Sequence, residues 1–240
     1  MSKVLTPIFD EKSHTYTDPI EDFQYTSVTR WIERFKPKFD EQKMAERVAA
    51  REGVSVELVL EAWEKKRKDS GVFGTNVHKA LENFHLTGKI NKEFADILHN
   101  FKDLKINLDK KKCFFEKLVF NKKLRIAGMS DIIMHNKDKK TFNVYDFKTN
   151  KKLRYVSPFG ESMLEPINQY PCSEYFTYSF QLSMYAYLYK LMSGLEPLRL
   201  KIFWYQRVEP ENYKNTKGSW RIINVPYLEE DVIKCLYHEA

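Results

Sequence analysis

The sequence predicts an α/β fold in which helices flank a mixed central sheet and the N-terminal region is helical. Two observations predict this fold. Residues 113–120, 124–135 and 141–148 are strand-like segments joined by short polar connections, so we expect a three-stranded antiparallel meander. A long helix at 173–192 and a strand at 198–207 follow, and this order of elements is typical of an α/β domain with a mixed sheet.

Helix signals dominate the region before the meander. Ser27, Asp40 and Ser55 are residue types that cap helix N-termini, so they predict three helices that begin at these positions. Apolar residues at spacings of three and four predict another helix that ends at Gly88. The predicted helices span 27–35, 40–53, 55–68, 71–86 and 92–104, and a weak alternation around 8–16 predicts a short hairpin before them.

We expect one domain over 1–240, because a chain of 240 residues can bury one substantial core. Within it we distinguish a mostly helical N-terminal region at 1–70, a core at 71–208, and a C-terminal strand and helix at 209–240. Residues 149–171 show no sustained periodicity, and loops of this length in compact domains are often functional.

Composition narrows the class of partner. The formal net charge of +7 and the isoelectric point near 9.0 favour polyanions, with nucleic acid first among them. The sequence has no apolar run of the roughly 20 residues that a membrane helix needs and no secretory signal pattern, so we expect a cytoplasmic protein without a membrane partner. Cys113, Cys172 and Cys235 are an odd number at wide spacing, which is untypical of a disulfide framework or a metal–sulfur site.

Acidic residues on the predicted meander give the first sign of chemistry. Side chains two apart share a face of a strand, so Asp146 and Lys148 project together as a D-x-K pair. On the two preceding strands Asp131 and Glu116 lie among apolar neighbours, where an unpaired carboxylate is costly. A divalent cation would stabilise such a cluster, and oxygen-rich ligand sets suit Mg²⁺ or Mn²⁺. The alternative is that Asp131 and Glu116 simply pair with lysines.

The helix predicted at 71–86 adds further candidates. Gly74, His78 and Glu82 recur at four-residue spacing and therefore lie on one side of that helix. A lone histidine in such a place is more often a satisfied polar residue, and Glu82 alone is more often a surface acid. Combined with the acids of the meander, however, the pattern favours a metal site.

In this order the motifs resemble the RecB-like branch of the PD-(D/E)XK nucleases, which includes phage exonucleases and CRISPR-associated adaptation nucleases. The resemblance covers roughly residues 26–205. It is carried by GTNVH at 74–78, Glu116, GMSD at 128–131, VYDFKTN at 144–150, and Gln181 with Tyr185. The order of G-x-x-D, D-x-K-T and a later Q-x-x-x-Y is more specific than any single motif.

The resemblance implies a metal-dependent site in which Asp131, Asp146 and Lys148 are catalytic. The ligands that it implies are His78, Asp131, Asp146 and the backbone carbonyl of Phe147, with Glu116 and Glu82 as candidates for holding a second cation. Lys148 would orient or activate the attacking water. Many RecB-like nucleases hold an iron–sulfur cluster with four cysteines, and we expect none in a chain that has three.

Two further groups are candidates for binding the substrate. Gln181 and Tyr185 lie four positions apart and therefore share a face of the long helix. By resemblance, they would orient the nuclease site or contact the nucleic-acid backbone. Lys151, Lys152 and Arg154 directly follow the D-x-K strand, where they could grip phosphates. The alternatives are that Tyr185 belongs to the core and that the basic run is a solvated end of the strand.

The favoured hypothesis is a Mg²⁺- or Mn²⁺-dependent DNA exonuclease that digests DNA ends, with a preference for single strands, and that works with recombination or replication proteins. The opening of the chain is similar to stand-alone phage members, which would place the protein in the host cytoplasm. One alternative is a structure-specific endonuclease on the same core. Another is a catalytically vestigial protein that only binds nucleic acid.

Overall fold

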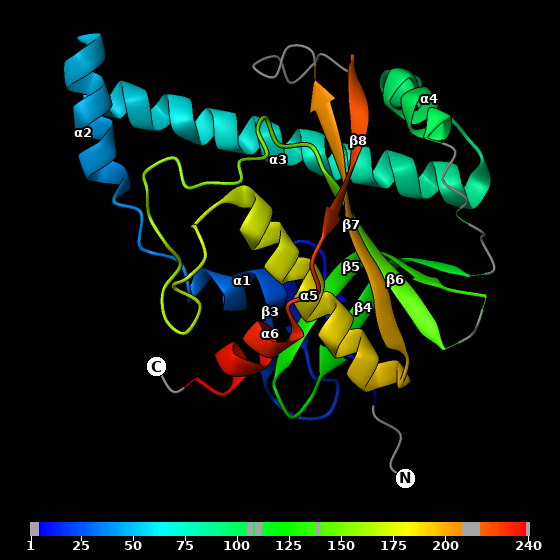
Figure 1. Ribbon diagram of the computed structural model, residues 1–240. Helices are drawn as coiled ribbons and strands as arrows, with labels where there is room; N and C mark the ends of the chain where they lie inside the picture. Colours follow the sequence, from blue (N-terminus) through cyan, green and yellow to red (C-terminus); the bar gives the residue numbers. More distant parts are fainter. Residues whose placement is uncertain (1–4, 105–107, 109–111, 138–139, 208–216, 239–240) are drawn as a thin grey trace.

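The computed structural model describes residues 5–104, 108, 112–137, 140–207 and 217–238 (Figure 1). Its strands are β1 (Ile8–Asp10), β2 (Thr15–Thr17), β3 (Gln24–Ser27), β4 (Cys113–Asn121), β5 (Ile126–His135), β6 (Thr141–Lys148), β7 (Glu196–Arg207) and β8 (Gly218–Val225). Its helices are α1 (Val28–Glu33), α2 (Glu41–Glu52), α3 (Val56–Thr87), the 3₁₀ turn η1 (Lys92–Phe94), α4 (Ala95–Asp103), α5 (Glu174–Ser193) and α6 (Glu229–Leu236).

The strands form one mixed sheet, as predicted. Its order in the described part of the chain is β1-β2-β3-β5-β6-β7-β8, and β4 pairs with β5 outside this path. Strands β4, β5 and β6 are the predicted antiparallel meander, and β7 returns after α5 to pair with β6 in parallel. The hairpin expected near the N-terminus is β1–β2, and β3 extends it to the parallel edge of β5.

Helices cover both faces of the sheet. Figure 1 shows α5 in front of the sheet and α3 crossing behind it. The core on the α5 side joins α5 and α1 to apolar side chains of the central strands, such as Phe142 and Val144 of β6. The core on the other side joins α3 and α4 to alternate residues of the same strand, Tyr145 and Phe147. Among the described residues, no helix is long and apolar enough to cross a membrane.

The predicted helix caps are confirmed. Ser27, Asp40 and Ser55 each accept a hydrogen bond from a backbone N–H in the first turn of the helix that follows. Ser173, which was not predicted as a cap, does the same for α5. The predicted break between helices at 55–68 and 71–86 is wrong, because α3 runs without interruption from Val56 to Thr87. A single glycine at position 71 costs a helix interior only about 1 kcal/mol, which burial of apolar residues on either side outweighs.

Strands β5 and β6 separate where the candidate site residues lie. Strand β5 pairs with β3 at Ile126 and Ala127, and it pairs with β6 only from Ile132 onward. Strand β6 leaves β5 after Tyr145 and continues along β7 through its last three residues, 146–148. Asp131 and the D-x-K motif therefore face each other at the point where the two strands diverge.

Candidate metal centre

Three distant segments meet at the point of divergence. The backbone N–H of Phe147 donates to Asp131 Oδ2 at 2.6 Å, which ties β6 to β5 just beyond their regular pairing. His78, on α3, lies 3.0 Å from the Phe147 carbonyl oxygen through Nε2 and 3.5 Å from Asp131 Oδ1 through Nδ1. The structure thus brings together His78, Asp131 and the Phe147 carbonyl, which are three of the four groups that the resemblance implied as metal ligands.

Glu116 reaches the same place through an unusual backbone conformation. Its φ of 45° lies in the left-handed region, which residues with a Cβ seldom adopt within a strand. Regular alternation along β4 would place Glu116 on the same face as Phe114 and Leu118, and that expectation is wrong, because the pairing with β5 passes from Phe115 to Lys117 without Glu116. Ligand atoms of Glu116, His78 and Asp131 all lie within 4.8 Å of one another, so these three residues could hold a metal ion.

Asp146 lies outside that group of three and pairs with the neighbouring lysine instead. Asp146 Oδ2 is 2.5 Å from Lys148 Nζ, and both side chains are largely buried. Lys148 Nζ also lies 4.7 Å from the centre of the Tyr178 ring on α5. The lysine is therefore held between a carboxylate and an aromatic face, with its charge directed toward the site.

Burial and mutual repulsion shift the pKa values of these groups. Burial raises the pKa of Glu116 to about 7, and the nearby Asp131 carboxylate adds to this rise. Burial also raises the pKa of Asp146 to about 6, although Lys148 opposes the shift. Burial lowers the pKa of His78, but Asp131 and Asp146 outweigh it and bring the value to about 9. A positive charge at this point therefore stabilises the cluster.

The residues present fit a divalent cation. Three buried or half-buried carboxylates, an imidazole and a backbone carbonyl converge, and this is a set of hard oxygen donors with one nitrogen. With its pKa near 9, His78 is charged at neutral pH, so its Nε2–H donates to the Phe147 carbonyl while its Nδ1–H faces Asp131 Oδ1. A cation bound there would take the place of that positive charge.

Glu82, Gln181 and Tyr185 are the remaining residues that the sequence suggested for the site on the helices. Glu82 lies one turn along α3 from His78, and its charge contributes to raising the pKa of Glu116. Gln181 donates from Nε2 to the hydroxyl of Tyr185 at 3.0 Å. Tyr185 is buried against β5, where its ring lies beside Gly128. Its burial agrees with the reading of Tyr185 as a core residue.

The basic run after β6 divides into two parts. Arg154 forms an ion pair with Glu174, because its Nε and Nη2 lie 2.9 Å and 2.5 Å from Glu174 Oε1. Lys151 and Lys152 stand closer to β6 in the sequence, and the charges of Lys66 and Lys152 add to burial in lowering the pKa of Lys151. Lys66, on α3, was not singled out from the sequence as a partner of this run.

Tyr178 is a second residue whose position the sequence analysis did not predict. It precedes Gln181 by one helical turn and belongs to the same side of α5, which is a signal that could have found it. The three cysteines, all of them among the described residues, form no disulfide and lie on separate segments, with Cys113 on β4, Cys172 before α5 and Cys235 on α6.

Comparison with known proteins adds little. No family model matches this chain, and no curated protein matches it. Among solved structures, it is similar to one titled "Crystal structure of SSO0001", at 14% sequence identity over 87% of this chain and 80% of that chain, with a TM-score of 0.32. A likeness at this TM-score carries no argument about function.

Proposed function

We propose that this chain is a divalent-metal-dependent DNA exonuclease of the PD-(D/E)XK superfamily. The observation that carries the proposal is the convergence of His78, Asp131 and the Asp146–Lys148 pair at the divergence of β5 and β6. These residues come from α3, β5 and β6, so their meeting depends on the fold and not on local sequence.

Mg²⁺ or Mn²⁺ suits this donor set better than a thiolate-seeking metal, because the candidate ligands are oxygens and one imidazole nitrogen. Such a cation supplies Lewis acidity and positive charge at the scissile phosphate. Asp131, Glu116 and His78 would hold it, and a cation near Glu116 would favour the ionised form of that carboxyl.

Lys148 supplies a second positive charge. Burial lowers the pKa of its ammonium group, but Asp146 and its other neighbours outweigh this effect and raise the pKa, so Lys148 stays protonated at neutral pH. Preorganised positive charge stabilises the negative charge that builds up on the phosphate oxygens during hydrolysis. The ammonium N–H groups can also orient the attacking water.

The basic surroundings support a polyanionic substrate. Lys151 and Lys152 follow Lys148 after Thr149 and Asn150, and Lys66 of α3 lies close enough to Lys151 to affect its pKa. Lysines that gather beside a buried acidic centre counter the repulsion that the acids exert on phosphate. The choice of DNA ends as substrate follows from the resemblance to stand-alone exonucleases.

Degradation of end-labelled DNA tests the proposal. The substrates are linear and covalently closed circular DNA, single- and double-stranded, incubated with Mg²⁺, Mn²⁺ or EDTA. We expect loss of the linear forms only, and only with a cation. An Asp146→Asn variant purified in the same way controls for contaminating nucleases. Cleaved circles would reassign the chain to the endonucleases, and tight binding without cleavage would make it a binding protein.

A further inference from the structure

A cavity of about 440 Å³ lies beside the candidate metal centre. Its walls come from the end of α1 and the segment after it, from residues 157–161, and from the first turn of α5 with Tyr178. This volume is within the range of about 300–1,000 Å³ that is usual for pockets that bind small organic groups. The proposed hydrolysis makes no use of this cavity.

Two exposed phenylalanines form one wall of the cavity. The side chains of Phe39 and Phe159 are 54% and 56% exposed, which is unusual for rings of this size. Their ring centres lie 6.1 Å apart with an interplanar angle of 33°. Rings exposed in this way offer apolar faces on which a planar aromatic group can stack.

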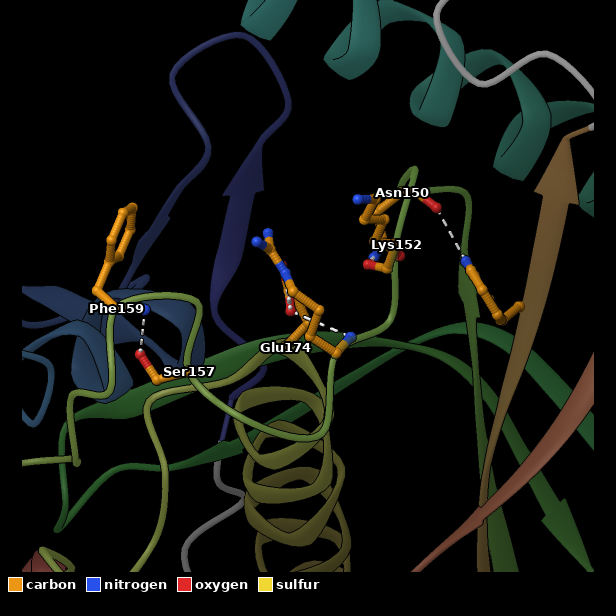
Figure 2. A network of polar contacts seen from close by, with 7 residues as sticks. Asn150, Lys152, Ser157, Phe159 and Glu174 are labelled. Carbon is orange, nitrogen blue, oxygen red and sulfur yellow. Dashed lines mark hydrogen bonds and ion pairs between the residues drawn. The ribbon is translucent and has the colours of Figure 1, made fainter. Parts of the chain in front are cut away.

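The charged groups around the cavity are largely paired. Lys36 lies 2.7 Å from Glu33, and Glu174 is held by Arg154 at 2.5 Å. Figure 2 shows Glu174 at the end of α5, between the turn that carries Phe159 and the segment that carries Lys152. The other charged residues of the lining, Lys38 and Glu161, have opposite charges, so the walls carry no excess of one sign that would select a free phosphate or a metal ion. The cavity therefore suits an uncharged ring better than either of these.

Tyr178 connects the cavity to the candidate metal centre. It lines the cavity, and its ring lies 4.7 Å from Lys148 Nζ. A nucleotide whose base enters the cavity would therefore have its backbone near Lys148. Lys152 lies on the segment that Figure 2 shows on the other side of Glu174 from Phe159, and Lys151 precedes it in the sequence.

We propose that this cavity binds one unpaired base of a single-stranded DNA end, stacked on Phe39 and Phe159, while the adjoining phosphodiester lies at Lys148. This inference rests on the proposed nuclease function and specifies its substrate. Every base has a face that can stack, so the cavity selects for unpaired bases and not for a particular sequence. A base within a duplex cannot enter unless it leaves its stack.

The test uses Phe39→Ala and Phe159→Ala, singly and together, in the full chain. Fluorescence anisotropy in EDTA, which prevents cleavage, measures the binding of a labelled oligo(dT), an abasic oligonucleotide of the same length and a blunt duplex. Tyr237→Ala is the matched control, because that aromatic side chain is 71% exposed and lies just after α6. Phe159→Tyr retains a ring that can stack, and thermal unfolding verifies that each variant is folded.

We expect the double variant to bind oligo(dT) about tenfold more weakly, since stacking on an aromatic side chain contributes substantially for each base. Binding of the abasic strand and of the duplex should stay within about twofold, and Phe159→Tyr and Tyr237→Ala should behave like the wild type. An equal loss on the abasic strand would overturn the proposal, because it would show that the rings do not contact a base.

The possible outcomes separate the two proposals. If the wild type binds and cleaves DNA while the phenylalanine variants bind oligo(dT) equally well, the base site is wrong and the nuclease stands. If oligo(dT) binding depends on Phe39 and Phe159 but no cation supports cleavage, the base site stands and the nuclease is wrong. A wild type that binds no oligo(dT) overturns the base site, and its cleavage of linear DNA with a cation then decides the nuclease proposal separately.

Discussion

Replacing Gly128 by alanine tests how the strand that carries Asp131 is held. A Cβ at Gly128 would lie 2.7 Å from Tyr185 Cε1 and 2.9 Å from Val28 Cγ2. Favourable carbon–carbon contacts are about 3.5–4.0 Å, so the new methyl group would overlap two neighbours by more than about 0.5 Å each. Tyr185 is buried and bonded to Gln181, and Val28 begins α1, so neither side chain can easily move away.

We expect Gly128→Ala to destabilise the protein by about 1–3 kcal/mol, the usual range for overpacking a core. For a chain of this size that corresponds to a fall in melting temperature of roughly 2–12 °C. Differential scanning calorimetry at neutral pH measures it. Displacement of α5 would also move Tyr178 away from Lys148, so we expect the rate of DNA cleavage to fall at temperatures where the variant is folded.

The same substitution at Gly71 is the matched control. Gly71 lies in the interior of α3, and a Cβ there would meet no atom within 4 Å. Alanine should therefore stabilise α3 by about 1 kcal/mol through its higher helix propensity. A melting temperature for Gly128→Ala equal to or above that of the wild type would refute the reasoning about packing of α5 and α1 on β5.

Two further predictions concern metal binding and acid stability. Asp131→Asn should lower the affinity for Mn²⁺, measured by titration calorimetry, by at least about tenfold. Glu82→Gln should change this affinity less. An unchanged affinity in Asp131→Asn would remove that residue from the site. The pKa of Asp18 is held well below its ordinary value of 3.8 by hydrogen bonds from the backbone N–H groups of Glu21 and Ile20 and from the side chains of Tyr25 and Lys122. Asp18 therefore contributes stability that is fully present above about pH 4 and is lost as the pH falls further, toward its folded-state pKa. In urea unfolding at pH 7, 4 and 2.5, the gap between wild type and Asp18→Asn should narrow at the lowest pH, and a constant gap would contradict the assignment.

Local signals in the sequence predicted much of the fold. Helix caps depend on a few neighbouring residues, which is why Ser27, Asp40 and Ser55 marked helix starts correctly. The continuity of α3 was missed because tertiary burial decides whether a helix passes a glycine, and burial is not a local property.

The candidate site was predictable as a set of residues and not as an arrangement. The motifs identified His78, Asp131 and Lys148, but the left-handed backbone of Glu116 has no signal in its own residue type. The engagement of Arg154 by Glu174 joins residues 20 positions apart, across a segment without periodicity. Neither this ion pair nor the cavity beside Tyr178 has a signal in the local sequence, and the role of Arg154 as a phosphate ligand stays a prediction.

The most direct test of the account compares the wild type with Lys148→Ala on end-labelled linear DNA as Mg²⁺ or Mn²⁺ is added. The lysine ammonium stabilises charge that appears during hydrolysis more than it binds the substrate. We predict that the variant loses at least about a hundredfold in cleavage rate while its DNA affinity, measured in EDTA, stays within about fivefold. Cleavage by Lys148→Ala at the wild-type rate would contradict the central claim that this site performs the hydrolysis.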